Sequence, residues 1–104
     1  MNYDKLIRDH IPAIIAETGR RCTTEVFSDA QYRVALRVKL VEEAQEVQAA
    51  SLQQLPTELA DVLEVIDALM KINGIEPAEV QRIQLARHQE RGGFSKRLRL
   101  LVVE

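Results

Sequence analysis

Residues 40–72 read LVEEAQEVQAASLQQLPTELADVLEVIDALMKI, and this stretch decides both the fold and the candidate site. Between Leu40 and Met70 it holds seven acidic residues and no Lys or Arg. The formal net charge of the chain is only −2, so the remaining residues, with 14 basic against 9 acidic side chains, sum to about +5. An acidic centre within a basic body suits a divalent cation and an anionic ligand held through it.

Two long helices joined by a short connection are predicted here. The first takes Asp29 as its N-cap and runs to about Ala50, and residues 52–55 form the connection. The second opens at Pro56 or the following Thr and runs to Ile72, where an Asn-Gly pair stops it. A connection this short makes the two helices antiparallel neighbours.

The start of the second helix has a rival. Ser51 and Gln54 have the spacing of a capping box, which would start the helix earlier. Pro56 would then lie beyond the first turn, so we favour the later start.

The flanking segments carry their own signals. A short helix is predicted over 11–18, and a third long helix from Glu76-Pro77 to Gly92-Gly93. Residues 22–27 and 98–103 are β-prone and are candidates for a short pairing with each other.

The bulk composition points to one small helical domain. A chain of 104 residues forms a single domain, residues 1–104, with one modest core. With no Trp and four aromatic residues, that core is built from Leu, Ile, Val and Ala, which favours helices. We therefore expect an all-α fold in which the hairpin packs in a bundle that oligomerisation completes.

Several classes of protein are disfavoured. The single Cys22 cannot form an internal disulfide, and the N-terminal residues lack the apolar run of a signal peptide. No stretch approaches the roughly 18–20 apolar residues of a membrane span. Net charge near −2 gives no reason to expect nucleic-acid binding. A cytoplasmic protein without a membrane or nucleic-acid partner is the expectation.

Four acids in the hairpin have matched spacing. Glu43 and Glu46 lie one turn apart on the first helix, and Glu58 and Asp61 repeat that spacing on the second. In an antiparallel hairpin the residue numbers of facing positions have a constant sum, and this sum is 104 for Glu46 with Glu58 and for Glu43 with Asp61. The sequence thus places two carboxylate pairs at two successive levels about 4.5 Å apart.

Glu58 sharpens this interpretation because it shares a helix face with Val62, Val65, Ile66 and Leu69. A carboxylate on an apolar face is costly unless it is paired or metal-bound. The alternative is a solvated acidic face, with Glu58 favoured by the dipole at its helix N-terminus. Oxygen ligands with no His or Cys nearby point to Mg²⁺, or Mn²⁺, rather than zinc.

These residues resemble a family. Glu43-x-x-Glu46 followed by Glu58-x-x-Asp61 is similar to the metal-binding signature of the MazG-like all-α nucleoside triphosphate pyrophosphohydrolases. The opening YDKLIRDHIP and the late RGGF at 91–94 resemble a short phosphoribosyl-ATP-pyrophosphohydrolase-like branch. The chain departs from that branch at His10, where a Lys is common, and around His88, where basic residues are common.

The resemblance implies Mg²⁺ at Glu43, Glu46, Glu58 and Asp61, and a homodimer or tetramer. The reaction it implies is cleavage of a nucleoside triphosphate to the monophosphate and pyrophosphate. House-cleaning of damaged nucleotides is one candidate role, and the sequence leaves the biological role open. Glu42 would orient or deprotonate the attacking water, next to Glu43 and Glu46.

Basic residues near the chain ends are candidates for holding phosphate, and we favour Lys5, Arg8 and Arg91. The alternative for each is an ordinary surface cation. Two other functions stay open: a phosphoribosyl-ATP pyrophosphohydrolase, and a non-catalytic helical dimerisation or regulatory module whose acids face solvent or a basic partner.

Overall fold

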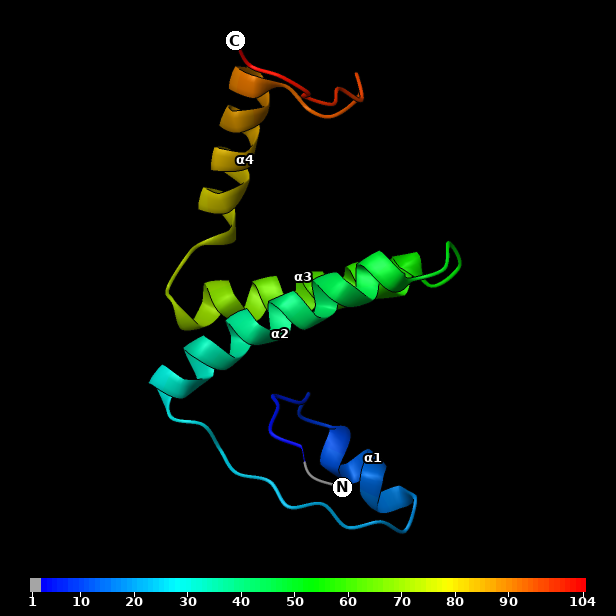
Figure 1. Ribbon diagram of the computed structural model, residues 1–104. Helices are drawn as coiled ribbons and strands as arrows, with labels where there is room; N and C mark the ends of the chain where they lie inside the picture. The colour runs from blue at the N-terminus through cyan, green and yellow to red at the C-terminus, as the bar shows by residue number, and fades with distance from the viewer. Residues whose placement is uncertain (1–2) are drawn as a thin grey trace. The chain divides into compact units, whose positions relative to one another are not determined.

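The computed structural model describes residues 3–104, and these residues form four helices and no strand (Figure 1). The helices are α1 (Ile11–Glu17), α2 (Asp29–Ala49), α3 (Leu55–Ile72) and α4 (Pro77–Arg91). The all-α class is therefore confirmed. The chain divides into two compact units, with the boundary between Gly74 and Ile75.

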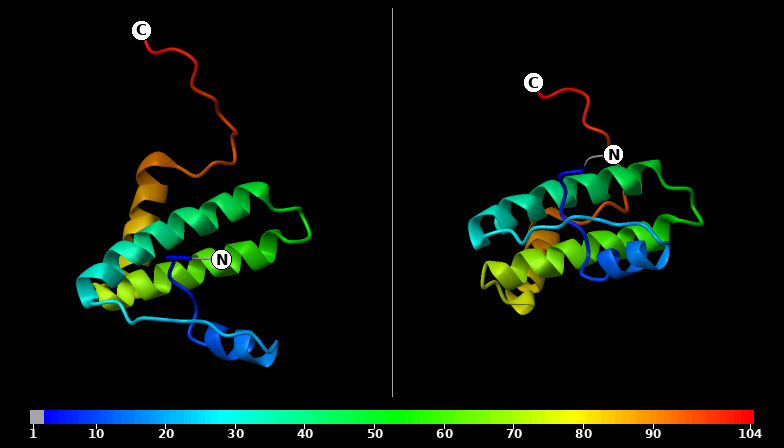
Figure 2. Two further views of the ribbon diagram at one scale, coloured as in Figure 1. Left: turned by 60° about the horizontal axis from the view of Figure 1, so that its bottom comes forward. Right: turned by 90° about the horizontal axis from the view of Figure 1, so that it is seen from below.

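The first unit is organised by α2 and α3, which lie side by side and antiparallel (Figures 1 and 2). Leu36 on α2 and Val65 on α3 are the buried residues at their seam, 2% and 7% exposed. At the far end of the hairpin, the guanidinium of Arg33 donates to the carbonyl oxygen of Ile72 at 3.4 Å. The residue numbers 33 and 72 sum to 105, which is close to the sum of 104 that the sequence predicts for facing residues at the acids. The two helices therefore face each other in nearly the predicted register.

The N-cap of α2 lies one residue before the expected cap, Asp29. Ser28 is the N-cap, and its hydroxyl accepts from the backbone N–H of Gln31 at 3.2 Å. The Gln31 side chain in turn accepts from the Ser28 backbone N–H at 3.0 Å. This capping box satisfies two backbone donors at the helix start, whereas Asp29 lies in the first turn, where the dipole favours its charge.

The α2–α3 connection contains the rival capping pair. Ser51 Oγ accepts from the Gln54 backbone N–H at 3.2 Å, and the Gln54 side chain accepts from the Ser51 N–H at 3.4 Å. These bonds close the turn that precedes α3, and the helix itself begins at Leu55. Pro56 then lies within the first turn of α3, where its missing N–H leaves no intrahelical bond unmade.

The expected β pairing is not formed: residues 22–27 and 98–103 have neither strand nor bridge conformation. A β-prone segment becomes a strand only when another strand satisfies its backbone groups. High β propensity in these short segments was therefore not sufficient, and the prediction of strands was wrong.

The second unit, residues 75–104, consists of α4 and the tail that follows it. Pro77 occupies the first turn of α4, and Gly92 ends it with a φ of +83°, as the sequence predicts. All residues from 75 to 104 are exposed. The single domain of residues 1–104 stays a prediction.

Apolar side chains also occupy the outer faces of the hairpin. Val34, Val38 and Val41 on α2 are 63%, 55% and 57% exposed, and Leu59 and Leu63 on α3 are 47% and 60% exposed. On each helix these residues lie roughly opposite the buried seam residue. The hairpin thus carries an apolar surface that it does not bury itself, and oligomerisation stays a prediction.

No helix within residues 3–104 combines the length and the apolar character that a membrane crossing requires.

Candidate metal centre

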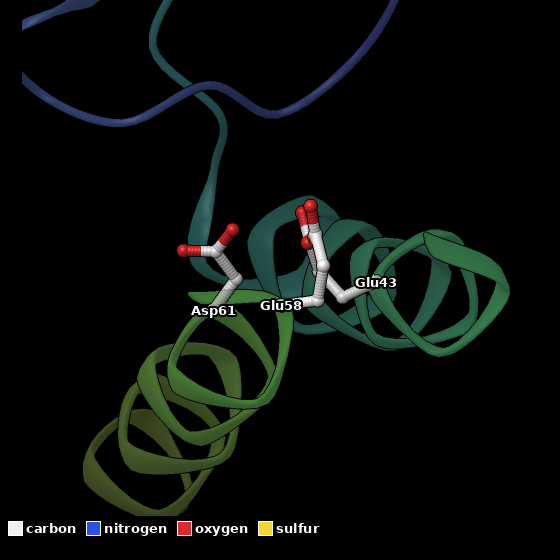
Figure 3. Close-up of side chains that lie close together, drawn as sticks. All are labelled: Glu43, Glu58 and Asp61. Carbon is white, nitrogen blue, oxygen red and sulfur yellow. The ribbon is translucent and has the colours of Figure 1, made fainter. Parts of the chain in front are cut away.

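Three carboxylates from the two central helices meet on one side of the hairpin (Figure 3). Glu43 comes from α2, and Glu58 and Asp61 come from the first two turns of α3. Each offers one oxygen atom, and the three oxygens all lie within 4.8 Å of one another. All three residues are half-buried. We call Glu43, Glu58 and Asp61 the acidic cluster.

The packing of the hairpin explains why these acids meet. Glu43 lies seven residues, or two turns, beyond Leu36 on α2, and Glu58 lies two turns before Val65 on α3. Both glutamates therefore continue the stripes that form the buried seam. Asp61 is one turn after Glu58 and reaches the same side of the hairpin (Figure 3).

The electrostatics of the acidic cluster are unfavourable for Glu58. Partial burial raises the pKa of Glu58 above its ordinary value of 4.5, and the negative charges of Asp61, Glu46 and Glu43 raise it further. The protein alone therefore disfavours the ionised form of this side chain. A cation among the three carboxylates would reverse that preference.

Glu46 is the predicted ligand that the structure does not bring into the cluster. Its side chain is exposed, although its charge is close enough to raise the pKa of Glu58. Three residues along a helix rotate a side chain by about 60°, which moves Glu46 from the seam position of Glu43 to the rim. Glu46 joins the other three only if its side chain turns inward.

Positive charges compensate the acids, which the sequence reasoning missed. Lys39 Nζ lies 3.4 Å from Glu43 Oε1 and 3.5 Å from Glu42 Oε2. Arg8 Nη2 lies 2.7 Å from Asp61 Oδ1. Both bases lie outside residues 40–70, so counting charges within that stretch did not reveal them.

The two missed bases differ in how readily the sequence could show them. Lys39 precedes Glu42 and Glu43 by three and four residues, a spacing that brings side chains together on any helix. Arg8 precedes Asp61 by 53 residues, so their pairing depends on the path of the chain before α2.

A pocket of about 510 Å³ adjoins the acidic cluster. Asp4, Lys5 and Leu6 form one wall, Phe27 contributes from the segment before α2, and α2 itself lines the other side from Ala30 to Glu42. Lys39 and Glu42 stand at the end of the pocket that adjoins Glu43. The pocket is lined by both apolar and charged side chains, a composition that ligand sites commonly have.

The remaining predicted site residues have different surroundings. Glu42 is half-buried, pairs with Lys39 and lines the pocket without joining the acidic cluster. Lys5 also lines the pocket, and its ammonium lies 5.3 Å from the centre of the Tyr3 ring. Arg91 lies in the last turn of α4 and belongs to the second unit.

The donor set fits a hard divalent cation. All three groups are carboxylates, with no His or Cys among them, and such oxygen ligands suit Mg²⁺ or Mn²⁺. Two oxygens on opposite sides of one Mg²⁺ lie about 4.2 Å apart, because each bond is about 2.1 Å long. The separations within the acidic cluster, up to 4.8 Å, therefore need a small side-chain adjustment to surround one ion.

Comparison with protein-family models, with curated proteins and with solved structures found no match to this chain.

Proposed function

We propose that this protein is a Mg²⁺-dependent nucleotide pyrophosphohydrolase, which cleaves a nucleoside triphosphate to the monophosphate and pyrophosphate. The observation that carries the proposal is the acidic cluster, in which two antiparallel helices bring three carboxylates within 4.8 Å of one another beside an open pocket. The motif resemblance in the sequence supports the same activity.

Glu43, Glu58 and Asp61 would hold the cation, and Glu46 would join them by turning inward. When bound, Mg²⁺ or Mn²⁺ neutralises phosphate charge and makes a coordinated water more acidic. Glu42, next to the cluster, is the carboxylate that would accept the proton of the attacking water. The oxygen of that water bonds to a phosphoryl group, the anhydride bond between the α and β phosphates breaks, and pyrophosphate leaves.

The pocket beside the cluster offers room for the nucleoside part of the substrate. Phe27, Val34 and Val38 give it an apolar lining, and Lys39 stands between it and Glu43. A nucleotide with its phosphates at the cluster and its base against these side chains would use both regions. Lys5 and Arg8 would then hold the triphosphate, and a phosphate-binding role for Arg91 stays a prediction from the sequence. A homo-oligomer acting in the cytoplasm to clear unwanted nucleotides completes the proposal.

One observation favours a second candidate, a non-catalytic helical module. Lys39 and Arg8 already neutralise part of the acidic cluster through ion pairs at 3.4 Å and 2.7 Å. Such pairs would allow the acids to be structural, with no cation. This candidate predicts no catalysis and no effect of Mg²⁺ on thermal melting, whereas a metal site stabilises the folded state by linkage.

The test is incubation of the purified protein with a panel of canonical and modified nucleoside triphosphates and a phosphoribosyl nucleotide, with Mg²⁺, followed by analysis for monophosphate and pyrophosphate. Three variants accompany the wild type: Glu46→Gln, Asp61→Asn and the control Asp67→Asn. Asp67 is an exposed acid on the same helix as Asp61 and lies outside the acidic cluster.

We expect the first two variants to lose turnover, with circular dichroism unchanged, and Asp67→Asn to retain it. Hydrolysis that survives in Asp61→Asn would exclude the proposed metal site. If no substrate is cleaved and Mg²⁺ does not change melting, the non-catalytic module is the better account.

A further inference from the structure

One ion pair connects the N-terminal segment to the acidic cluster. Arg8 Nη2 donates to Asp61 Oδ1 at 2.7 Å, a length typical of a strong charge-assisted hydrogen bond. The Arg8 side chain is 57% exposed and that of Asp61 is 34% exposed. A side chain that is mainly in solvent therefore donates directly to one of the three candidate ligands.

This contact has no polar substitute elsewhere in the segment. Within the described residues 3–27, every other hydrogen bond is local, such as that from Thr18 Oγ1 to the Ile15 carbonyl. Helix α1 contributes no buried residue. The attachment of this segment to the hairpin thus rests on the Arg8–Asp61 pair and on the packing of half-buried side chains such as Leu6 and Ile7. Segments with so few contacts open at low cost in free energy.

We infer that Arg8 competes with a divalent cation for Asp61, so that metal binding at the acidic cluster releases the N-terminal segment from α3. The inference rests on the proposed metal site. A cation that coordinates the Asp61 carboxylate withdraws electron density from it, and this weakens the hydrogen bond that the carboxylate accepts from Arg8. The cation also repels the positively charged guanidinium at short range. The two partners of Asp61 therefore oppose each other.

The competition has a reciprocal consequence. If the cation weakens the Arg8–Asp61 pair, that pair must weaken binding of the cation by the same factor. Lys39 has the same relation to Glu43, but it lies on α2 itself and its release moves no other segment. Of the two bases, only Arg8 connects the acidic cluster to a separate part of the chain.

The competition also sets the order in which the cation and the nucleotide bind. Asp4, Lys5 and Leu6 form one wall of the 510 Å³ pocket and lie just before Arg8. Release of Arg8 therefore frees this wall to adjust, and it frees a guanidinium to bind phosphate oxygens. The cation binds first, and Arg8 becomes available to the phosphates of a nucleotide afterwards.

The test measures Mn²⁺ affinity of the full chain by electron paramagnetic resonance of the free ion, for wild type, Arg8→Gln and Arg20→Gln. Arg20 is an exposed arginine of the same segment, and its replacement changes the net charge by the same amount. Exposed ion pairs contribute about 0.2–1 kcal/mol, so Arg8→Gln should bind Mn²⁺ about 1.4- to fivefold more tightly than Arg20→Gln.

Amide hydrogen exchange of residues 11–19, whose backbone N–H groups make the hydrogen bonds of α1 and its flanking turns, gives a second readout that does not depend on catalysis. In the wild type, Mg²⁺ should accelerate exchange in this segment, and Arg8→Gln should exchange rapidly with or without Mg²⁺. Circular dichroism checks that the helices are retained.

The outcomes separate the two proposals. Saturable Mn²⁺ binding with equal affinity in Arg8→Gln and Arg20→Gln, or Mg²⁺ that slows exchange of residues 11–19, overturns the competition and leaves the metal site standing. The absence of saturable binding in all three proteins overturns both.

Discussion

Replacing Leu36 with Ala removes the most buried side chain of the hairpin that positions the acidic cluster. Leu36 is 2% exposed, so the substitution takes three carbon atoms out of a buried site. At about 0.8 kcal/mol for each buried methylene-sized group, the transfer term is about 2.4 kcal/mol. A residual cavity adds to this value, and Leu-to-Ala changes in protein cores cost roughly 2–5 kcal/mol. We expect a loss of about 2.5 kcal/mol.

The assay is urea unfolding followed by circular dichroism at 222 nm, with Gln45→Ala as the matched control. Gln45 is exposed on the same helix, so its replacement should change the free energy of unfolding by less than about 0.5 kcal/mol. With a slope of roughly 1–2 kcal/mol per molar urea, Leu36→Ala should lower the midpoint by about 1–2.5 M. Equal midpoints for the two variants would refute the α2–α3 seam as the core of this unit.

Three further predictions follow from the same structure. Because the pKa of Glu58 is raised, its ionisation destabilises the folded state. Glu58→Gln should therefore raise the melting temperature in EDTA at pH 7, and the gain should vanish below about pH 4, where both forms are neutral; a gain that persists at pH 3 would contradict this cause. Ser28→Ala removes half of the α2 capping box and should cost about 1 kcal/mol in urea unfolding, and an unchanged midpoint would argue against the cap. If a second copy covers the outer apolar faces, Val41→Glu with Leu63→Glu should lower the mass found by analytical ultracentrifugation to that of the monomer, whereas an oligomer that survives both charges must use another surface.

The helices were predictable because their signals are local. Pro12 and Pro77 lie in the first turns of α1 and α4, and Gly92 with its positive φ ends α4. The α2–α3 hairpin followed from the short connection alone. Its register brings together Glu43, Glu58 and Asp61, three of the four acids that the spacing placed in facing pairs, and leaves out Glu46, which was expected opposite Glu58.

Other features depend on the path of the chain and were not predictable. Residues 22–27 have β-prone side chains, but strand formation needs a partner that propensity does not supply. The Arg8–Asp61 pair joins residues 53 apart, and no periodic pattern relates them. Glu46 lies three residues after Glu43 and stays at the rim, whereas Asp61 lies three residues after Glu58 and joins the cluster, so the spacing alone did not decide which acids meet.

Titration of Mn²⁺ into wild type and Glu43→Gln, with free Mn²⁺ measured by electron paramagnetic resonance, tests most directly whether the acidic cluster binds a divalent cation. Glu43 carries the least exposed of the ion-paired carboxylates, with 14% of its side chain accessible, and contributes one of the three oxygens. We predict saturable binding in the wild type that Mg²⁺ displaces, and at least tenfold weaker binding in Glu43→Gln. The absence of saturable binding in the wild type, or equal affinity in the two proteins, would contradict the account.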